Sequence, residues 1–184
     1  MLAFLALMST AQAETTLSAS PMGALGFALM NIGDFAVNLE HQRGQHGLLL
    51  EASGLHVHGN PTHTTLIGGG LGYRYHFGEG SFAGVLVGAK QGHAKFKYDY
   101  LSGDLDSHWR YEVRQTSVIP HIGHRWELGE HLRITARLGV GLGQHQVQTD
   151  VEDPGVAAAT ELLEDRLQFT PLKLDSELSL GWAF

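Results

Sequence analysis

The stretch LRITARLGVGLGQHQV, residues Leu132–Val147, alternates between apolar residues and residues that are charged, polar or glycine. Successive side chains of an extended chain point to opposite faces, so this alternation predicts a β-strand with one apolar and one polar face. The apolar face comprises Leu132, Ile134, Ala136, Leu138, Val140 and Leu142. The polar face comprises Arg133, Thr135, Arg137, Gly139, Gly141 and Gly143.

The same period of two recurs along most of the chain. Leu172–Phe184 repeats it clearly, with leucines and Trp182 on one face and Lys, Asp and Glu on the other. Looser alternation predicts six further strands: Met22–Asn31, Phe35–Gln42, Leu48–Val57, Thr64–Phe77, Phe82–Tyr98 and Trp109–Trp126. The predicted total is therefore eight. Pro120 lies inside one of these strands, and because proline has no amide hydrogen we expect a bulge or a weak pairing there.

The connections between the predicted strands differ in length. The tight ones are Arg43–Gly47, Gly78–Ser81 and Glu127–His131, and the long polar ones are Tyr100–His108 and Asp150–Arg166. Two more, Ile32–Asp34 and His58–His63, would be short loops at the end that carries the long ones. Short turns at one end and longer loops at the other are typical of outer-membrane β-barrels.

Composition narrows the class of protein. The chain has 184 residues, enough for one domain. Its 24 glycines are nearly twice the usual share, whereas its 17% of charged residues is below the roughly 25% of a typical soluble domain. A net charge of −7 without any Lys/Arg cluster argues against nucleic-acid binding. The lack of cysteine excludes disulfides and thiolate metal sites.

The first residues, MLAFLALMSTAQA, have an apolar core followed by the small-x-small pattern Ala11-Gln12-Ala13. This pattern predicts a signal peptide over residues 1–13, cleaved before Glu14, and a single barrel domain over residues 14–184. A buried N-terminal helix is the alternative. Beyond this segment no run of 18 apolar residues predicts a helical membrane span.

Alternation alone does not separate a membrane barrel from a soluble sandwich with one solvated face. The polar faces here combine glycines with charged residues: Gly68, Gly70, Gly72, Gly139, Gly141 and Gly143 beside Arg74, Lys90, Arg133, Arg137, Lys173, Asp175 and Glu177. Small residues on the inner face of a narrow barrel leave room for long charged side chains to pair across the lumen. The sequence therefore predicts a polar lumen closed by a charged network, too narrow for a conducting pore.

The aromatic residues fall into two groups. Those near the tight turns or the C-terminus are Tyr73, Tyr75, Phe77, Phe82, Trp126, Trp182 and Phe184. Those near the opposite ends are Phe35, Phe96, Tyr98, Tyr100, Trp109, Tyr111 and Phe169, and Phe27 alone lies in mid-strand. Two aromatic bands are typical of a barrel that crosses two membrane–water interfaces.

The last residues, LSLGWAF, place Phe184 at the end of an alternating strand. They resemble the C-terminal signature of bacterial outer-membrane proteins, which implies recognition of this strand by the barrel-assembly machinery. The segment Ser20–Leu55 is similar to the start of a family of small Gram-negative barrels of unassigned function. In overall build the mature chain resembles the OmpA/OmpX/OmpW-like class of eight-stranded barrels.

The 12 histidines raise the question of a metal site. The best cluster is His56 and His58 with His63 near a predicted outer loop. His56 and His58 share a strand face, so two imidazoles could bind one ion. A further fixed ligand is not evident from the sequence, and we predict no metal site and no cofactor. We expect His41, His46 and His131, together with His76, His121, His124 and His145, to be interfacial or lumenal polar groups.

Some eight-stranded outer-membrane barrels modify lipid A, and the deacylase type resembles a Ser/His/Glu site built around a His-x-Ser motif. None of the histidines here is followed two residues later by serine, and Gly80–Gly84 does not have the spacing of a G-x-S-x-G elbow. A site using Ser53, Ser117 or Ser179 stays open, but nothing in the sequence singles one out.

The residues thus predict an outer-membrane, eight-stranded antiparallel β-barrel that contacts lipid, is monomeric and has a structural or surface-interaction role without an enzymatic site. Any binding function is expected on the loops Tyr100–His108 and Asp150–Arg166. The alternatives are a lipid-modifying enzyme and a soluble periplasmic lipocalin-like barrel, which would have an apolar interior and a polar outside.

Overall fold

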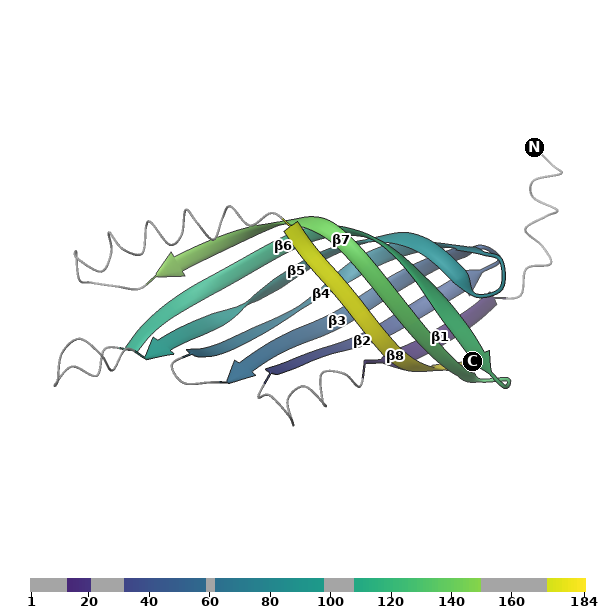
Figure 1. Cartoon of the computed structure of the whole chain (residues 1–184), viewed down its shortest axis with the longest axis horizontal. Coiled ribbons are helices and arrows are strands. Elements are labelled where there is room, and N and C mark those ends of the chain that lie inside the picture. The colour runs from purple at the N-terminus through teal and green to yellow at the C-terminus, as the bar shows by residue number, and fades with distance from the viewer. Residues whose placement is uncertain (1–12, 21–31, 59–61, 98–107, 150–171) are drawn as a thin grey trace.

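The structure, a computed structural model, describes residues 13–20, 32–58, 62–97, 108–149 and 172–184. Its strands are β1 (Ala13–Ala19), β2 (Ile32–Arg43), β3 (His46–His58), β4 (Thr62–Phe77), β5 (Ser81–Lys97), β6 (His108–Leu128), β7 (Leu132–Thr149) and β8 (Leu172–Ala183). They form one closed antiparallel barrel in chain order, in which β8 pairs with β1 (Figure 1). The predicted all-β, eight-stranded architecture is confirmed. Within the described ranges no helix is long and apolar enough to cross a bilayer.

Three tight turns lie at one end of the barrel, on the right in Figure 1. The residue pairs that close them are Arg43 and His46, Phe77 and Ser81, and Leu128 and Leu132. The glycines with positive φ in these turns are Gly44 (61°), Gly78 (60°), Gly80 (91°) and Gly129 (76°). A side chain with a Cβ rarely adopts this left-handed backbone, so glycine determines where the chain reverses. The three predicted tight turns are confirmed.

The first strand is not the one that the sequence predicts. The barrel begins with Ala13–Ala19, which pairs with β2 over its whole length and with β8 over Thr16–Ala19. Its alternation is weak, because Leu17 is its one large apolar residue. The ladder bonds on both of its edges compensate for the poor pattern. Met22–Asn31 lies outside the described residues, as does the predicted signal peptide except for Ala13.

Pro120 interrupts one ladder without shifting its register. On the β5 side Pro120 pairs with Val85. On the β7 side the pairing stops at Val118 and resumes at His121, with the same number of residues on both strands between the two points. The predicted weak pairing is confirmed, but there is no extra residue as in a bulge. The missing amide hydrogen of proline accounts for a break confined to one edge.

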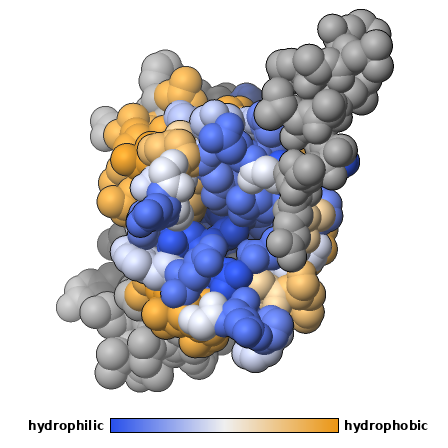
Figure 2. Space-filling model, turned by 90° about the vertical axis from the view of Figure 1, so that its right-hand side faces the viewer, coloured by the Kyte–Doolittle hydropathy of each residue, from blue (hydrophilic) through white to orange (hydrophobic). Residues whose placement is uncertain are grey.

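The two faces of the barrel wall differ sharply in polarity. Outward-facing leucines are largely exposed: Leu71 to 68%, Leu138 to 65% and Leu174 to 81%. The buried polar or charged residues are Thr16, Asn38, Glu40, Glu51, Ser53, Arg74, His76, Gln115, His121, Arg125, Arg133, Thr135, Arg137, Glu177 and Ser179. Figure 2 looks onto the tight-turn end, where hydrophilic residues occupy the middle and hydrophobic ones the periphery. The predicted polar lumen is confirmed.

The lumen also holds a small apolar core that the sequence pattern did not predict. Its members are Leu49 on β3, Leu66 on β4, Phe82 and Leu86 on β5 and Ile119 on β6. These four strands are neighbours in the barrel. Apolar side chains therefore line part of the lumen, on strands that also carry the inward charged residues Glu51, Arg74 and Arg125.

Candidate functional site

A buried carboxylate, Glu40 on β2, is surrounded by cationic and polar donors. Arg74 Nη1 donates to Glu40 Oε2 at 2.6 Å, and Arg125 makes a second hydrogen bond to the same oxygen. His76 Nε2 lies 2.7 Å from Glu40 Oε1. Because Arg74 and Arg125 come from β4 and β6, this cluster ties three non-adjacent strands together at the tight-turn end of the lumen.

A second cluster has the opposite charge arrangement. Arg137 on β7 contacts Glu51 at 2.9 Å, Asp175 at 2.8 Å and Glu177 at 2.9 Å. Asn38 Nδ2 donates to Glu177 Oε1 at 2.6 Å. Three carboxylates therefore share one guanidinium, whereas two guanidinium groups surround the single Glu40. A third pair, Arg133 with Glu14 at 2.7 Å, lies at the tight-turn end.

Together these contacts link strands on opposite sides of the lumen. A buried charge is tolerated only when it is paired and hydrogen-bonded, and each of these carboxylates has a guanidinium partner. Arg74, Arg133, Arg137 and Glu177, predicted to face inward, do so. Sequence reasoning missed the partners Glu40, Glu51 and Arg125, although each occupies the inward parity of its strand and the same alternation could have identified them.

Phe82 corrects the predicted aromatic band near the tight turns. It is fully buried in the lumen, where the Arg74 guanidinium carbon lies 4.4 Å from the ring centroid. Its register partner is Gly123. A Cβ on Gly123 would lie 2.3 Å from Phe82 Cζ, so the glycine makes space for the ring. Parity and a cation–π contact place Phe82 inside rather than at an interface.

The other members of that band do face outward. Tyr73, Tyr75, Phe77, Trp126, Trp182 and Phe184 are exposed near the tight-turn end. In the predicted opposite band, Phe35 is exposed and covers Gly54 on the neighbouring strand. The side chains of Phe27, Phe96, Tyr98, Tyr100, Trp109, Tyr111 and Phe169 lie outside the described part of the chain.

Histidines accompany the aromatic residues at the tight-turn end. His46 Nδ1 lies 2.6 Å from the Tyr73 hydroxyl, and the His131 ring stacks on Trp182 with centroids 5.1 Å apart. His41 Nδ1 lies 3.0 Å from Thr15 Oγ1 on the adjacent strand. His41, His46 and His131 are exposed polar groups near the tight turns. His76 and His121 are buried in the lumen, as predicted, and the side chain of His145 is not described.

One serine and one histidine meet in the geometry of a catalytic pair. Ser81 Oγ lies 3.1 Å from His124 Nδ1 on the outer surface, and Trp126 packs edge-on against the same imidazole. A Ser/His nucleophile normally needs a carboxylate that orients the histidine. Among the described residues, His124 contacts Ser81 and Trp126 and no carboxylate. Ser53 and Ser179 are buried in the lumen, and neither hydrogen-bonds a histidine of the described chain.

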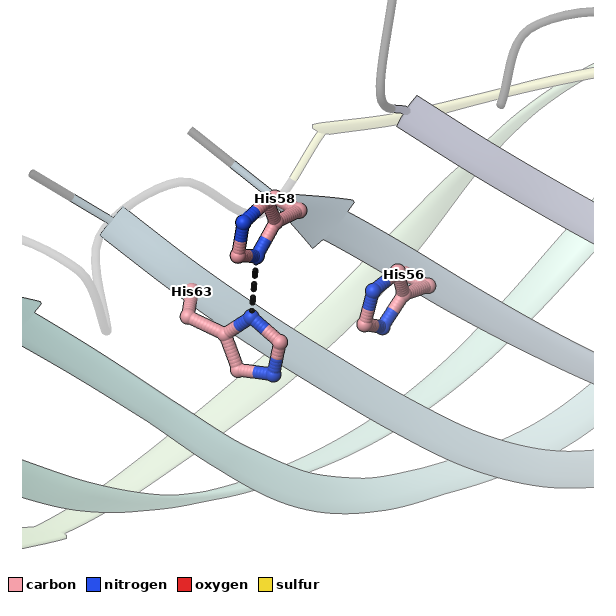
Figure 3. A group of neighbouring side chains, drawn as sticks. All are labelled: His56, His58 and His63. Atoms are coloured by element: carbon pink, nitrogen blue, oxygen red, sulfur yellow. Dashed lines mark hydrogen bonds between the residues drawn. The ribbon is translucent and has the colours of Figure 1, made fainter. Parts of the chain in front are cut away.

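Three histidines meet on the outer surface at the opposite end of the barrel. His56 and His58 lie on β3, and His63 on β4 is the register partner of His58. One ring nitrogen from each lies within 4.8 Å of the other two (Figure 3). The sequence grouped His63 with His56 and His58 but identified only two imidazoles as possible ligands of one ion. The contact of His63 with His58 depends on the antiparallel pairing of β3 with β4.

A cavity of about 900 Å³ lies along β4, β5 and β6. Its charged or ionisable lining residues are Lys90, His93, Glu112 and Arg114. The loops on which a binding function was expected, Tyr100–His108 and Asp150–Arg166, lie outside the described residues except for His108, which begins β6. Comparison with known proteins found no matching family model, no matching curated protein and no matching solved structure.

Proposed function

We propose that this protein is an outer-membrane β-barrel that crosses the bilayer with its apolar outer wall and serves a structural or surface-interaction role. The observation that carries the proposal is the inverted polarity of the barrel, with hydrocarbon outside and buried ion pairs within. A soluble lipocalin-like barrel would have the reverse arrangement. Lipid is the partner that such an outer surface suits, because water would leave its exposed leucines unfavourably solvated.

The outward-facing apolar residues form a belt around the barrel, and the height of this apolar belt supports the proposal. On β7 the outward residues from Leu132 to Leu142 are apolar. Ten residue steps of roughly 3.3 Å, tilted by roughly 40°, span about 25 Å, which is the height of the apolar band of outer-membrane barrels. The exposed residues that follow on the same face are Gln144, Gln146 and Gln148. On β7 the apolar residues therefore give way to polar ones at the height where the hydrocarbon layer of a bilayer would end.

On β5 and β6 the outward-facing residues also change from apolar to polar at this height. Val118 on β6 pairs with Leu142, and the next outward pair is Thr116 with Gln144. Outward residues beyond this level are polar on β5 and β6: Gln91, His93, Glu112 and Arg114. This polar rim extends the wall past the belt, and we propose that it and the loops above it form the surface available to partners.

The filled lumen favours a structural role over conduction. The two arginine–carboxylate clusters and the apolar core both line the lumen, and about eight strands leave an interior that side chains can fill. We infer that the barrel works as a monomeric platform whose loops carry any binding function.

Cell fractionation combined with gel mobility tests the proposal. We expect the protein in the outer-membrane fraction, with an unheated band that migrates faster than the heated one because the barrel stays folded in detergent. Recovery in the soluble periplasmic fraction with one band that heating does not shift would reject a membrane-spanning barrel.

A further inference from the structure

We propose that His56, His58 and His63 bind one divalent transition-metal ion of the zinc or copper class. The proposal stands on side-chain geometry at the end of the β3–β4 hairpin and does not rest on the membrane assignment. His58 is exposed, and His56 and His63 are half-buried, so the site faces solution while two of its rings are held by the wall.

The separation of the ring nitrogens suits a shared ion. His58 Nδ1 and His63 Nδ1 lie 2.9 Å apart (Figure 3). With metal–nitrogen bonds of roughly 2.0–2.1 Å, two imidazoles on one ion have nitrogens about 3.3 Å apart in a tetrahedral site and about 2.9 Å apart in a square-planar one. The two nitrogens therefore need to separate by at most a few tenths of an ångström, and each ring must also turn so that its lone pair points to an ion off the line between them.

The third histidine is oriented by a neighbouring hydroxyl. His56 Nδ1 lies 3.0 Å from Thr65 Oγ1 on β4. Histidines that bind metal commonly use the second ring nitrogen to hydrogen-bond a polar group, which fixes the ring and its tautomer. We assign Nε2 of His56 as its ligand atom and Thr65 as the positioning residue.

The donor set determines the class of ion. Three imidazoles suit zinc, copper or nickel, whereas magnesium and calcium prefer carboxylate, carbonyl and water oxygens. Three protein ligands also leave a coordination position for water or for a group from outside the chain. Since the ligands come from both strands, a bound ion would cross-link β3 and β4 beside their connection.

Titration of the full-length barrel, folded in detergent micelles and stripped of metal with a chelator, tests the site. We expect one Zn²⁺ or Cu²⁺ per chain at this site by isothermal titration calorimetry, and no saturable binding of Mg²⁺ or Ca²⁺. Thr65→Val should weaken binding by about 10- to 100-fold and Thr65→Ser should restore it, because only the hydroxyl is needed. His63→Ala should weaken binding at least as much.

His41→Ala is the matched control. His41 is an exposed histidine on β2 at the tight-turn end of the barrel, whereas the three clustered residues lie at the opposite end. Loss of this imidazole should leave the affinity for Zn²⁺ or Cu²⁺ unchanged. Equal losses with His41→Ala and His63→Ala, or a triple variant His56→Ala, His58→Ala and His63→Ala that keeps wild-type stoichiometry and affinity, would overturn the proposal.

Each variant is first checked for the same β-sheet circular dichroism spectrum as the unaltered protein. A measurement on the unaltered protein avoids dependence on variant folding: electron paramagnetic resonance of one equivalent of Cu²⁺ should show hyperfine coupling to several imidazole nitrogens. A spectrum of aqueous Cu²⁺ alone would reject the site. Neither result depends on which cell fraction holds the protein, so failure of this proposal is distinguishable from failure of the membrane assignment.

Discussion

Arg137 on β7 and Glu51 on β3 lie on opposite walls of the barrel, and Arg137 Nη2 donates to Glu51 Oε2 at 2.9 Å. The contact crosses the lumen and joins strands that share no backbone ladder. Asp175 and Glu177 on β8 contact the same guanidinium. The stability of the lumen should therefore depend on Arg137 more than on any one of its acidic partners.

Arg137→Leu should lower the free energy of unfolding by about 3–5 kcal/mol, because it leaves buried carboxylates without their cation. Urea unfolding of the barrel folded in lipid vesicles measures this change. Arg114→Leu is the control, since Arg114 is exposed on the outer face of β6, and its effect should stay within about 0.5 kcal/mol. Similar losses in the two variants would contradict the bracing role of Arg137.

Two glycines that lie under aromatic rings should respond differently to alanine. A Cβ on Gly123 would lie 2.3 Å from Phe82 Cζ and 2.4 Å from the Ala136 carbonyl oxygen. On Gly54 its nearest neighbours would all be atoms of the Phe35 ring. A ring at the barrel surface can rotate away, whereas a ladder carbonyl cannot.

Gly123→Ala should therefore lower the free energy of unfolding by about 1–3 kcal/mol, the usual range for overpacking, and Gly54→Ala should lower it by less. Phe35→Leu should relieve most of the cost of Gly54→Ala, while Phe82→Leu should leave much of the cost of Gly123→Ala in place. Double-mutant cycles on unfolding free energies provide the comparison. Full relief of Gly123→Ala by Phe82→Leu would show that the backbone contact is unimportant.

Arginine in the apolar belt should be far more costly than arginine beyond it. Leu138 lies in the belt, and Gln146 lies on the same face of β7 above it. We expect Leu138→Arg to lower stability in vesicles by about 2–4 kcal/mol and Gln146→Arg by about 0–1 kcal/mol, because only the first charge enters hydrocarbon. Equal tolerance of both substitutions would mean that lipid does not cover Leu138.

Deletion of the gene should leave the acylation of lipid A unchanged. His124 contacts Ser81 but, within the described chain, no carboxylate that would orient it for acyl transfer. Mass spectrometry of lipid A from deletion and complemented strains measures the acyl chains. A change that is restored by the unaltered protein but not by Ser81→Ala would instead assign catalysis to this pair.

Local patterns in the sequence were sufficient for most of the architecture. The period of two in Leu132–Val147 and Leu172–Phe184 identified strands and the face that each side chain occupies. The glycines of the tight turns mark where the chain reverses, because the ability of glycine to adopt a positive φ does not depend on distant contacts. The first strand was missed because Ala13–Ala19 has one large apolar residue and is stabilised by ladders to β2 and β8.

The sites were predicted less completely. The inward position of Arg137 follows from its strand, but its partner Glu51 is distant in the chain. Phe82 lies near a tight turn as the outward aromatic residues do, but its parity on β5 places it on the inner face of the wall. The pair His56 and His58 was evident from spacing alone.

The sequence by itself thus determined the strands, the turns and which face of the wall is polar, because these depend on neighbours one or two residues apart. The tertiary structure alone decided which charges pair across the lumen and that His63 joins His58. Those contacts depend on how eight strands close and in which register they align, and no local pattern encodes the distance between residues on different strands.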